Sequence, residues 1–130
     1  MIFLSVLSRV RKGFWILLEN LPLWLARIEK AVETTKRAGL NTLASFILGV
    51  PGETSAMIKD TIKFARRLNP KYAQFTLCTP YPGTRLFELA KEKGMLITSD
   101  WRRYTTVEPI MHIPGITAEE LKKLFIVYIV

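Results

Sequence analysis

The chain contains a single cysteine, Cys78, and a single histidine, His112, in 130 residues. One cysteine excludes a disulfide framework within the chain and is compatible with a reducing cytoplasm, which is the location we expect. One histidine excludes a metal site built mainly from histidines of this chain. Because no apolar run reaches about 18 residues, the sequence predicts no transmembrane helix.

Two common phosphate-binding patterns are also missing. No Gly-x-Gly-x-x-Gly is present, and no Lys-Ser or Lys-Thr follows Gly52, so a nucleoside triphosphate site is not predicted. Acidic residues are few: 11 Asp and Glu stand against 19 Lys and Arg, which gives a net charge of +8. Because the basic residues occur in pairs spread along the chain, we interpret them as solvated helix surfaces. A basic membrane-surface or nucleic-acid-binding protein is the alternative.

Two apolar runs each end at a turn of glycine and proline and then lead into a helical pattern. The first run begins at Phe46 and enters the turn Gly49–Glu53, and the second enters the turn Thr79–Thr84. Two successive strand–turn–helix units are typical of a parallel α/β sheet or barrel, so the predicted fold class is α/β. These turns follow the carboxyl ends of the strands, where such folds bind their ligands.

Periodicity predicts the individual elements. A helix is expected from about Leu23 to the stop at Gly39. The other expected elements are a strand buried on both faces at 42–48, a helix capped by Thr54 or Ser55 and ended by Asn69-Pro70, a strand at 72–78, a helix at 85–93, and a last helix with a capping box of Thr117 and Glu120.

Both turns carry candidate ligand contacts. Glycines in the turn Gly49–Glu53 allow close backbone approach and Pro51 stiffens it, although an ordinary turn between strand and helix explains the same residues. Two prolines around Tyr81 make that segment rigid, as a wall of a ligand pocket or as a cover for the sheet end. We interpret Cys78 as an inert buried thiol, and Glu53 as a partner of the helix dipole rather than an acid or base.

The order of these motifs resembles a known family. A helix ends in Ala38-Gly39, a strand leads into Gly-x-Pro-Gly-Glu-Thr at 49–54, a helix carries Phe64-Ala65, a strand leads into Thr-Pro-Tyr-Pro-Gly-Thr at 79–84, and Asp100-Trp101 follows a helix that stops at glycine. Over roughly residues 25–125 the chain resembles the second half of a radical S-adenosylmethionine (radical SAM) catalytic domain. The similarity is to the subgroup that contains methylthiotransferases and cobalamin-dependent methyltransferases or cyclases. Upstream, the segment Val6–Gly13 resembles, more weakly, the helix after the fourth barrel strand.

The resemblance implies a partial (β/α) TIM-like barrel of six parallel strands, of which this chain supplies the last two βα units and a C-terminal helix. It also implies that Ile47 lies against the adenine ring of S-adenosylmethionine and that Ser45 contacts its ribose. The remaining residues implied to line the cofactor pocket are Gly49, Pro51 and Gly52 in the first turn and Thr79 and Tyr81 in the second.

The chain lacks the two motifs that the family needs for its radical chemistry. Radical chemistry of this kind needs a [4Fe-4S] cluster held by three cysteines in Cys-x-x-x-Cys-x-x-Cys, and this chain has only Cys78. The Gly-Glu motif that would hold the methionyl amine is missing as well. The sequence therefore predicts a fragment that is inactive alone, with an irregular or helical remnant at residues 1–22 and the carboxyl-terminal part of the barrel at residues 23–130.

Two partner hypotheses follow from an incomplete domain. A separate cysteine-bearing chain would supply the missing amino-terminal half, which would make this chain a non-catalytic complementing module. The bare edge of a two-stranded sheet would also favour self-association. The substrate, whether a small molecule, an RNA or a protein, is not specified by these residues.

Overall fold

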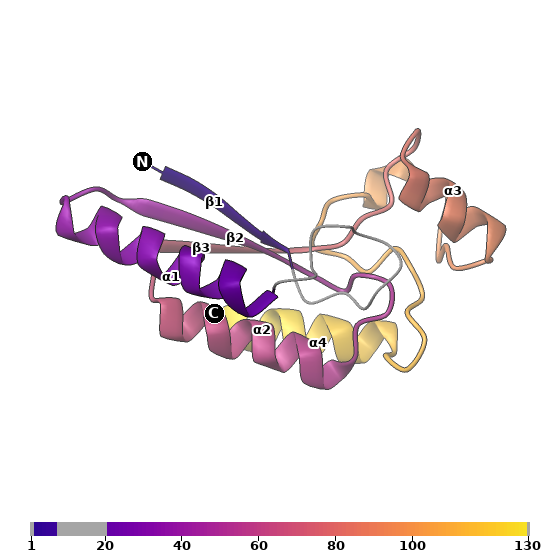
Figure 1. Ribbon diagram of the computed structural model, residues 1–130. Coiled ribbons are helices and arrows are strands. Elements are labelled where there is room, and N and C mark those ends of the chain that lie inside the picture. Colours follow the sequence, from indigo (N-terminus) through magenta and orange to yellow (C-terminus); the bar gives the residue numbers. More distant parts are fainter. Residues whose placement is uncertain (1, 8–20, 130) are drawn as a thin grey trace.

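Three parallel strands form one sheet, and helices cover one side of it (Figure 1). The computed structural model describes the backbone of residues 2–7 and 21–129 and the side chains of residues 25–126. In chain order the elements are β1 Ile2–Leu7, α1 Leu21–Arg37, β2 Thr42–Leu48, α2 Ser55–Leu68, β3 Tyr72–Leu77, α3 Arg85–Glu92, a 3-10 turn Trp101–Arg103, and α4 Ala118–Ile129.

Strand β2 lies in the centre of the sheet, with β1 and β3 parallel to it on either side. Leu7 is paired with Ile47, and Ile47 is paired with Thr76, so the carboxyl ends of the three strands meet at one edge. Helices α1 and α2 are the crossovers that parallel neighbours require. Figure 1 shows α1, α2 and α4 on the same side of the sheet, with α3 beyond the carboxyl ends of the strands.

Alternate residues of β2 point to opposite sides of the sheet. The residues that face the helices are fully buried: Thr42, Ala44, Phe46 and Leu48. The residues between them are only half-buried: Leu43, Ser45 and Ile47. The prediction of a strand buried on both faces is therefore wrong, because the described helices cover one face only. We call the other side of the sheet the open face.

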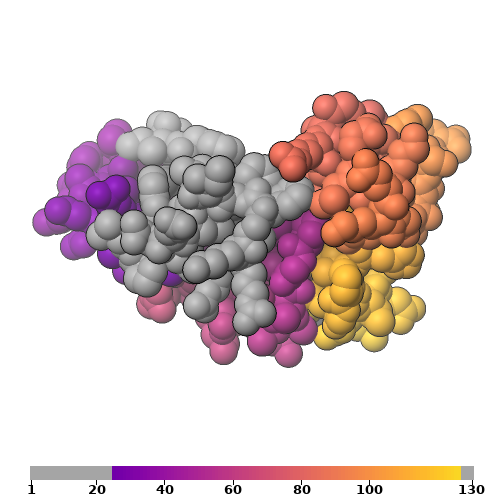
Figure 2. Space-filling model, turned by 45° about the vertical axis from the view of Figure 1, so that its right-hand side comes forward, coloured from indigo at the N-terminus to yellow at the C-terminus, as the bar shows by residue number. Residues whose placement is uncertain are grey.

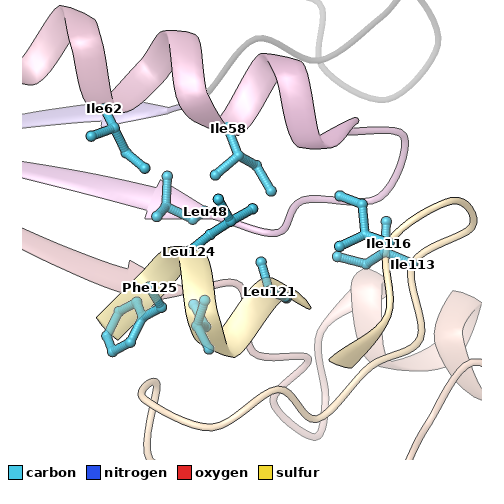
Figure 3. Packing of buried hydrophobic residues seen from close by; sticks show 9 residues of the cluster. Leu48, Ile58, Ile62, Ile113, Ile116, Leu121, Leu124 and Phe125 are labelled. Atoms are coloured by element: carbon cyan, nitrogen blue, oxygen red, sulfur yellow. The ribbon is translucent and has the colours of Figure 1, made fainter. Parts of the chain in front are cut away.

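Two apolar clusters hold the helices on the sheet. The first contains Leu48, Ile58, Ile62, Leu77, Ile113, Ile116, Leu121, Leu124 and Phe125, and Figure 3 shows these side chains converging between β2, α2 and α4. The second lies beneath α1 and is centred on Phe46, whose ring stacks on that of Phe75 with 5.0 Å between centroids. Because Phe75 packs against both clusters, it joins them into one continuous core.

Local side-chain chemistry fixes the ends of the helices. Thr54 caps α2 by accepting a backbone hydrogen bond, and Asn69 ends it in the left-handed conformation with φ 45°. Thr117 accepts the amide of Glu120 at the start of α4. The Glu120 carboxylate, which a complete capping box would turn back to Thr117, instead accepts a hydrogen bond of 2.9 Å from Ser55 Oγ. This contact joins the start of α4 to the start of α2.

The structure differs from the sequence interpretation at the amino terminus. The sequence predicts an irregular or helical remnant at residues 1–22, yet Ile2–Leu7 form a strand that pairs with β2. A short apolar run suits a buried strand and a buried helix equally well, and here the available edge of β2 favours the strand. Residues 8–20, and with them most of the segment Val6–Gly13, lie outside the described residues. The sheet thus has three strands rather than two.

Truncating the stacked aromatic pair tests this description of the core. We expect Phe46→Ala to lower the free energy of unfolding by about 3–5 kcal/mol, because a fully buried ring is lost and leaves a cavity. Leu40→Ala is the matched control, since Leu40 is 50% exposed, and it should change stability by less than about 0.5 kcal/mol. Urea-induced unfolding monitored by circular dichroism measures both. Equal effects of the two variants would contradict this core.

Candidate functional site

The open face of the sheet places Ser45 and Ile47 side by side along β2. Their neighbours in register on β3 are Gln74 and Thr76. Near the carboxyl ends of the strands, this face therefore offers the aliphatic side chain of Ile47 together with two hydroxyls and an amide. Within the described residues, no hydrogen bond engages the hydroxyl of Ser45. Gln74 and Thr76 are additional to the predicted site residues, although strand alternation puts them on the side opposite to Phe75.

Glu53 closes the turn that follows β2. Its carboxylate is 1% exposed, and Oε2 accepts hydrogen bonds from the amides of Gly49 at 2.7 Å and Val50 at 2.9 Å. Its own amide donates to the carbonyl of Val50 at 3.0 Å. Glu53 directly precedes the cap Thr54, and its carboxylate binds the turn before the helix; the role as a partner of the helix dipole stays a prediction. Glu53 fixes the backbone at the carboxyl end of β2.

The two glycines of this turn have different surroundings. Gly49 has φ +78°, and a Cβ on it would lie 3.0 Å from Leu121 Cδ2 and 3.3 Å from Ile113 Cδ1. Close packing against α4 and the segment before it therefore explains this glycine without a ligand. Gly52 has φ +90°, and a Cβ on it would meet nothing within 4 Å, so its requirement is conformational. Pro51, between them, is half-buried.

Cys78 lies beside this turn, directly after β3. Its amide donates to the carbonyl of Leu48 at 2.7 Å, which extends the β2–β3 pairing by one residue. Burial, together with the smaller effect of the negative charge of Glu53, raises the pKa of the Cys78 thiol to about 11. The thiol is therefore protonated at neutral pH and is a poor nucleophile and a poor metal ligand, as the sequence interpretation expected.

The segment after β3 carries a row of aromatic rings. Tyr81 and Trp101 are 44% and 55% exposed, and Tyr104 lies between them with ring centroids at 6.3 Å and 5.1 Å respectively. Figure 2 shows this part of the chain, coloured orange, as a lobe above α4. Thr79 is half-buried and donates to the carbonyl of Leu77 at 3.1 Å. Thr79 thus binds back to the end of β3, whereas Tyr81 belongs to the aromatic row.

Some basic side chains of the described residues pair with acidic ones. Four surface pairs join arginine to a carboxylate: Arg37 with Glu33, Arg67 with Glu29, Arg102 with Asp100, and Arg103 with Glu108. In the Arg102–Asp100 pair the guanidinium holds the pKa of the carboxyl below its usual value. The side chains of these pairs are solvent-exposed, which agrees with the interpretation of solvated surfaces.

Among the described residues, neither the grooves nor the possible metal ligands identify the site on their own. Grooves of about 340, 520 and 450 Å³ lie beside β3, between α1 and α2, and at the amino ends of the strands. In the part of the chain that the structure describes, no group of three or more His, Cys, Asp or Glu side chains could hold a metal ion. Nor is any helix there long and apolar enough to cross a membrane. Strand register and turn geometry therefore define the site.

Comparison with known proteins gives partial matches. No protein-family profile matches the chain. An uncharacterized methyltransferase of Pyrococcus horikoshii is 51% identical over 94 residues, which cover 72% of this chain and 20% of that protein. The anaerobic magnesium-protoporphyrin IX monomethyl ester cyclase of Rubrivivax gelatinosus is 33% identical over 93 residues, which cover 72% of this chain and 16% of that protein. The bacteriochlorophyllide d C-8(2)-methyltransferase of Chlorobaculum tepidum is 26% identical over 85 residues, which cover 65% of this chain and 19% of that protein. The chain spans a fifth or less of each of these relatives.

Replacing Glu53 tests its role in the turn. We expect Glu53→Ala to lower the free energy of unfolding by about 2–4 kcal/mol, because two buried amides lose a charged acceptor. Glu53→Gln keeps an oxygen acceptor and should cost about half as much. Glu92→Ala, at an exposed position of α3, is the control and should be nearly neutral. Urea titrations give the three values, and a neutral Glu53→Ala would show that the turn does not need the carboxylate.

The Cys78 thiol should titrate near pH 11 in the folded protein and near its ordinary value of 9.0 in the unfolded chain. The ¹³Cβ chemical shift of the single labelled cysteine measures both, with urea supplying the unfolded reference. Because the folded pKa is raised, the stability contributed by the protonated thiol is complete below pH 9 and is lost as the pH rises toward 11. Glu53→Gln should lower the folded pKa, and an unchanged pKa would contradict the assigned charge effect.

Proposed function

We propose that the chain is the carboxyl-terminal part of a radical SAM barrel domain and that its open face forms part of the cofactor pocket. The observation that carries this proposal is the position of Ser45 and Ile47, half-buried on the uncovered side of a parallel sheet, near the carboxyl ends of its strands. Partial similarity to a methyltransferase and to a cyclase supports it. In this proposal β1, β2 and β3 are the last three strands of the barrel.

The described residues fit the nucleoside portion of S-adenosylmethionine. Ile47 offers an apolar surface to the adenine ring, and the free hydroxyl of Ser45 can hydrogen-bond a ribose hydroxyl. Thr76 lies beside Ile47 in register and adds a second hydroxyl to the same surface. The closed turn at Glu53 keeps the backbone of Gly49–Gly52 at a fixed position beside this surface. When bound, the cofactor supplies methyl or radical chemistry, and this chain's residues bind and orient it.

The described residues do not fit the iron–sulfur cluster. A cluster needs three thiolates, and the one cysteine of the chain has a thiol that stays protonated at neutral pH. We therefore assign cluster binding to a different polypeptide segment, on the same protein or on a separate chain. No chemical step is assigned to this chain beyond binding and positioning.

The relatives also suggest the reaction class of the complete protein. Their names specify methyl transfer in two cases and a cyclase reaction in another. We propose that the complete protein catalyses one of these reactions and that it belongs to the cobalamin-linked subgroup. The substrate would be selected by segments outside these 130 residues.

Complementation tests the proposed function. The chain is combined anaerobically with the part of the Pyrococcus relative that precedes the matched segment, together with iron and sulfide, and S-adenosylmethionine binding is measured by calorimetry. We expect binding by the combined polypeptides, weakened about tenfold or more by Ile47→Asp and severalfold by Ser45→Ala. The loss follows from a charge placed where the adenine ring needs an apolar surface.

Leu40→Asp is the matched control for Ile47→Asp. It introduces the same charge at an exposed position before β2, at the opposite end of the sheet, and should leave binding unchanged. Circular dichroism verifies that each variant folds. Binding that is absent from the combined polypeptides, or that survives Ile47→Asp unchanged, would contradict the proposed function.

A further inference from the structure

The outer edge of β3 is free over most of its length. The amide of Cys78 donates inward to β2, and the amide of Leu77 donates outward to the carbonyl of Thr106 at 2.7 Å. Because successive backbone groups of a strand alternate in direction, the amides and carbonyls of Ala73 and Phe75 also point outward. Within the described residues, Thr106 alone supplies a backbone partner to this edge, and it reaches only the carboxyl end.

The sequence of β3 contains neither the charged residues nor the proline that usually protect a free edge. Tyr72–Leu77 contains no charged residue and no proline, and Tyr72, Ala73 and Gln74 are exposed. Proteins usually block a free edge with lysine, proline or a bulge, because unpaired backbone groups otherwise attract another strand. Here the blocking features lie only at the two ends, with Pro70-Lys71 before the strand and Thr106 after it. The centre of the edge is therefore suited to pairing.

We propose that a second copy of this chain pairs antiparallel with the free edge of β3, about a two-fold axis at Gln74. In this arrangement Ala73 and Phe75 of one copy exchange backbone hydrogen bonds with Phe75 and Ala73 of the other. Gln74 then faces Gln74 in the pair without hydrogen bonds, where the side chains come closest. Because Thr106 already occupies the amide of Leu77, the pairing cannot extend further, which fixes the register.

The groove and the helix beside β3 also lie so that two copies related by this axis can fit each other. A groove of about 340 Å³ lies beside the amino-terminal half of β3, between Ala65 of α2 and Ala73. Helix α4 packs beneath the sheet, where Leu124 of α4 and Leu77 of β3 belong to the same apolar cluster. An antiparallel pair brings each α4 toward the groove of the other copy. Ile126, which is 50% exposed on α4, supplies apolar surface for such an interface.

This arrangement explains why a second copy suits the edge better than an unrelated strand. The contact is isologous, so each uncharged edge meets an identical one, and no like charges face each other in the paired segment. A stable dimer buries about 1,200–2,000 Å² in total, so the groove and α4 must contribute along with the strands. The pairing does not involve the outer edge of β1, which lies on the opposite side of the sheet.

Sedimentation equilibrium of the full chain tests the pairing. We expect a monomer–dimer equilibrium in which Gln74→Lys raises the dissociation constant at least tenfold, because two like charges then face each other. Ala73→Pro removes an outward amide without affecting the β2–β3 hydrogen bonds, and it should have a similar effect. Ser99→Lys adds the same charge at an exposed loop position and should leave the equilibrium unchanged. Circular dichroism verifies folding.

Disulfide trapping tests the register. In a Cys78→Ala background, Gln74→Cys should form a covalent dimer under mild oxidation, because residues facing each other in such a pair have Cβ atoms about 4.5–5.5 Å apart. Tyr72→Cys is equally exposed but should not cross-link, since the axis places the two copies of residue 72 about 13 Å apart. A monomer at all concentrations, a dimer insensitive to both strand variants, or preferential cross-linking through residue 72 would overturn the proposal.

Discussion

The two crossover helices that join the parallel strands pack on the same face of the sheet, and α4 joins them there. The helices must bury their apolar stripes, so one set of alternating strand residues becomes core, with Phe46 and Leu48 at its centre. The other set, including Ser45 and Ile47, has no helix above it in the described residues. Every feature of functional interest follows from this asymmetry. The chain has a solid core and also a face on which polar and aliphatic groups are still available.

The carboxyl end of the sheet is held by polar contacts rather than by apolar packing alone. Glu53 binds the amides of the turn after β2, and Glu120 binds Ser55 at the start of the next helix. Both carboxylates lie near the segment that joins β2 to α2. The Glu120 carboxylate binds Ser55 of α2 and not its own helix start, which a capping box would require. The turn also packs against α4 and the segment before it, where there is no room for a side chain at Gly49. A ligand at this end would therefore meet a pre-formed surface.

The relation to methyltransferases and cyclases is compatible with an incomplete site. The residues that we propose to contact a nucleoside lie on β2 and β3, while the cysteines that a cluster requires are not found in this sequence. A barrel divides naturally in this way, because each βα unit contributes its own part of the rim. Similarity restricted to a fifth or less of the relatives agrees with a chain that carries one portion of such a rim. In our proposals the two outer edges of the sheet have separate uses, one toward the preceding strands and one toward a second copy.

The sequence determined the elements whose signals are local. The strands at 42–48 and 72–77, the cap at Thr54, the stop at Asn69 and the helix after Thr84 all follow from periodicity, capping chemistry and glycine or proline positions. It also determined the protonated state of Cys78, because an apolar strand end is a poor environment for a thiolate. Only the tertiary structure decided that Ile2–Leu7 pair as a strand, that one face of β2 stays open, and that Glu53 binds its own turn. Each of these depends on which distant segment reaches a given edge or face, and the sequence near a residue does not encode that information.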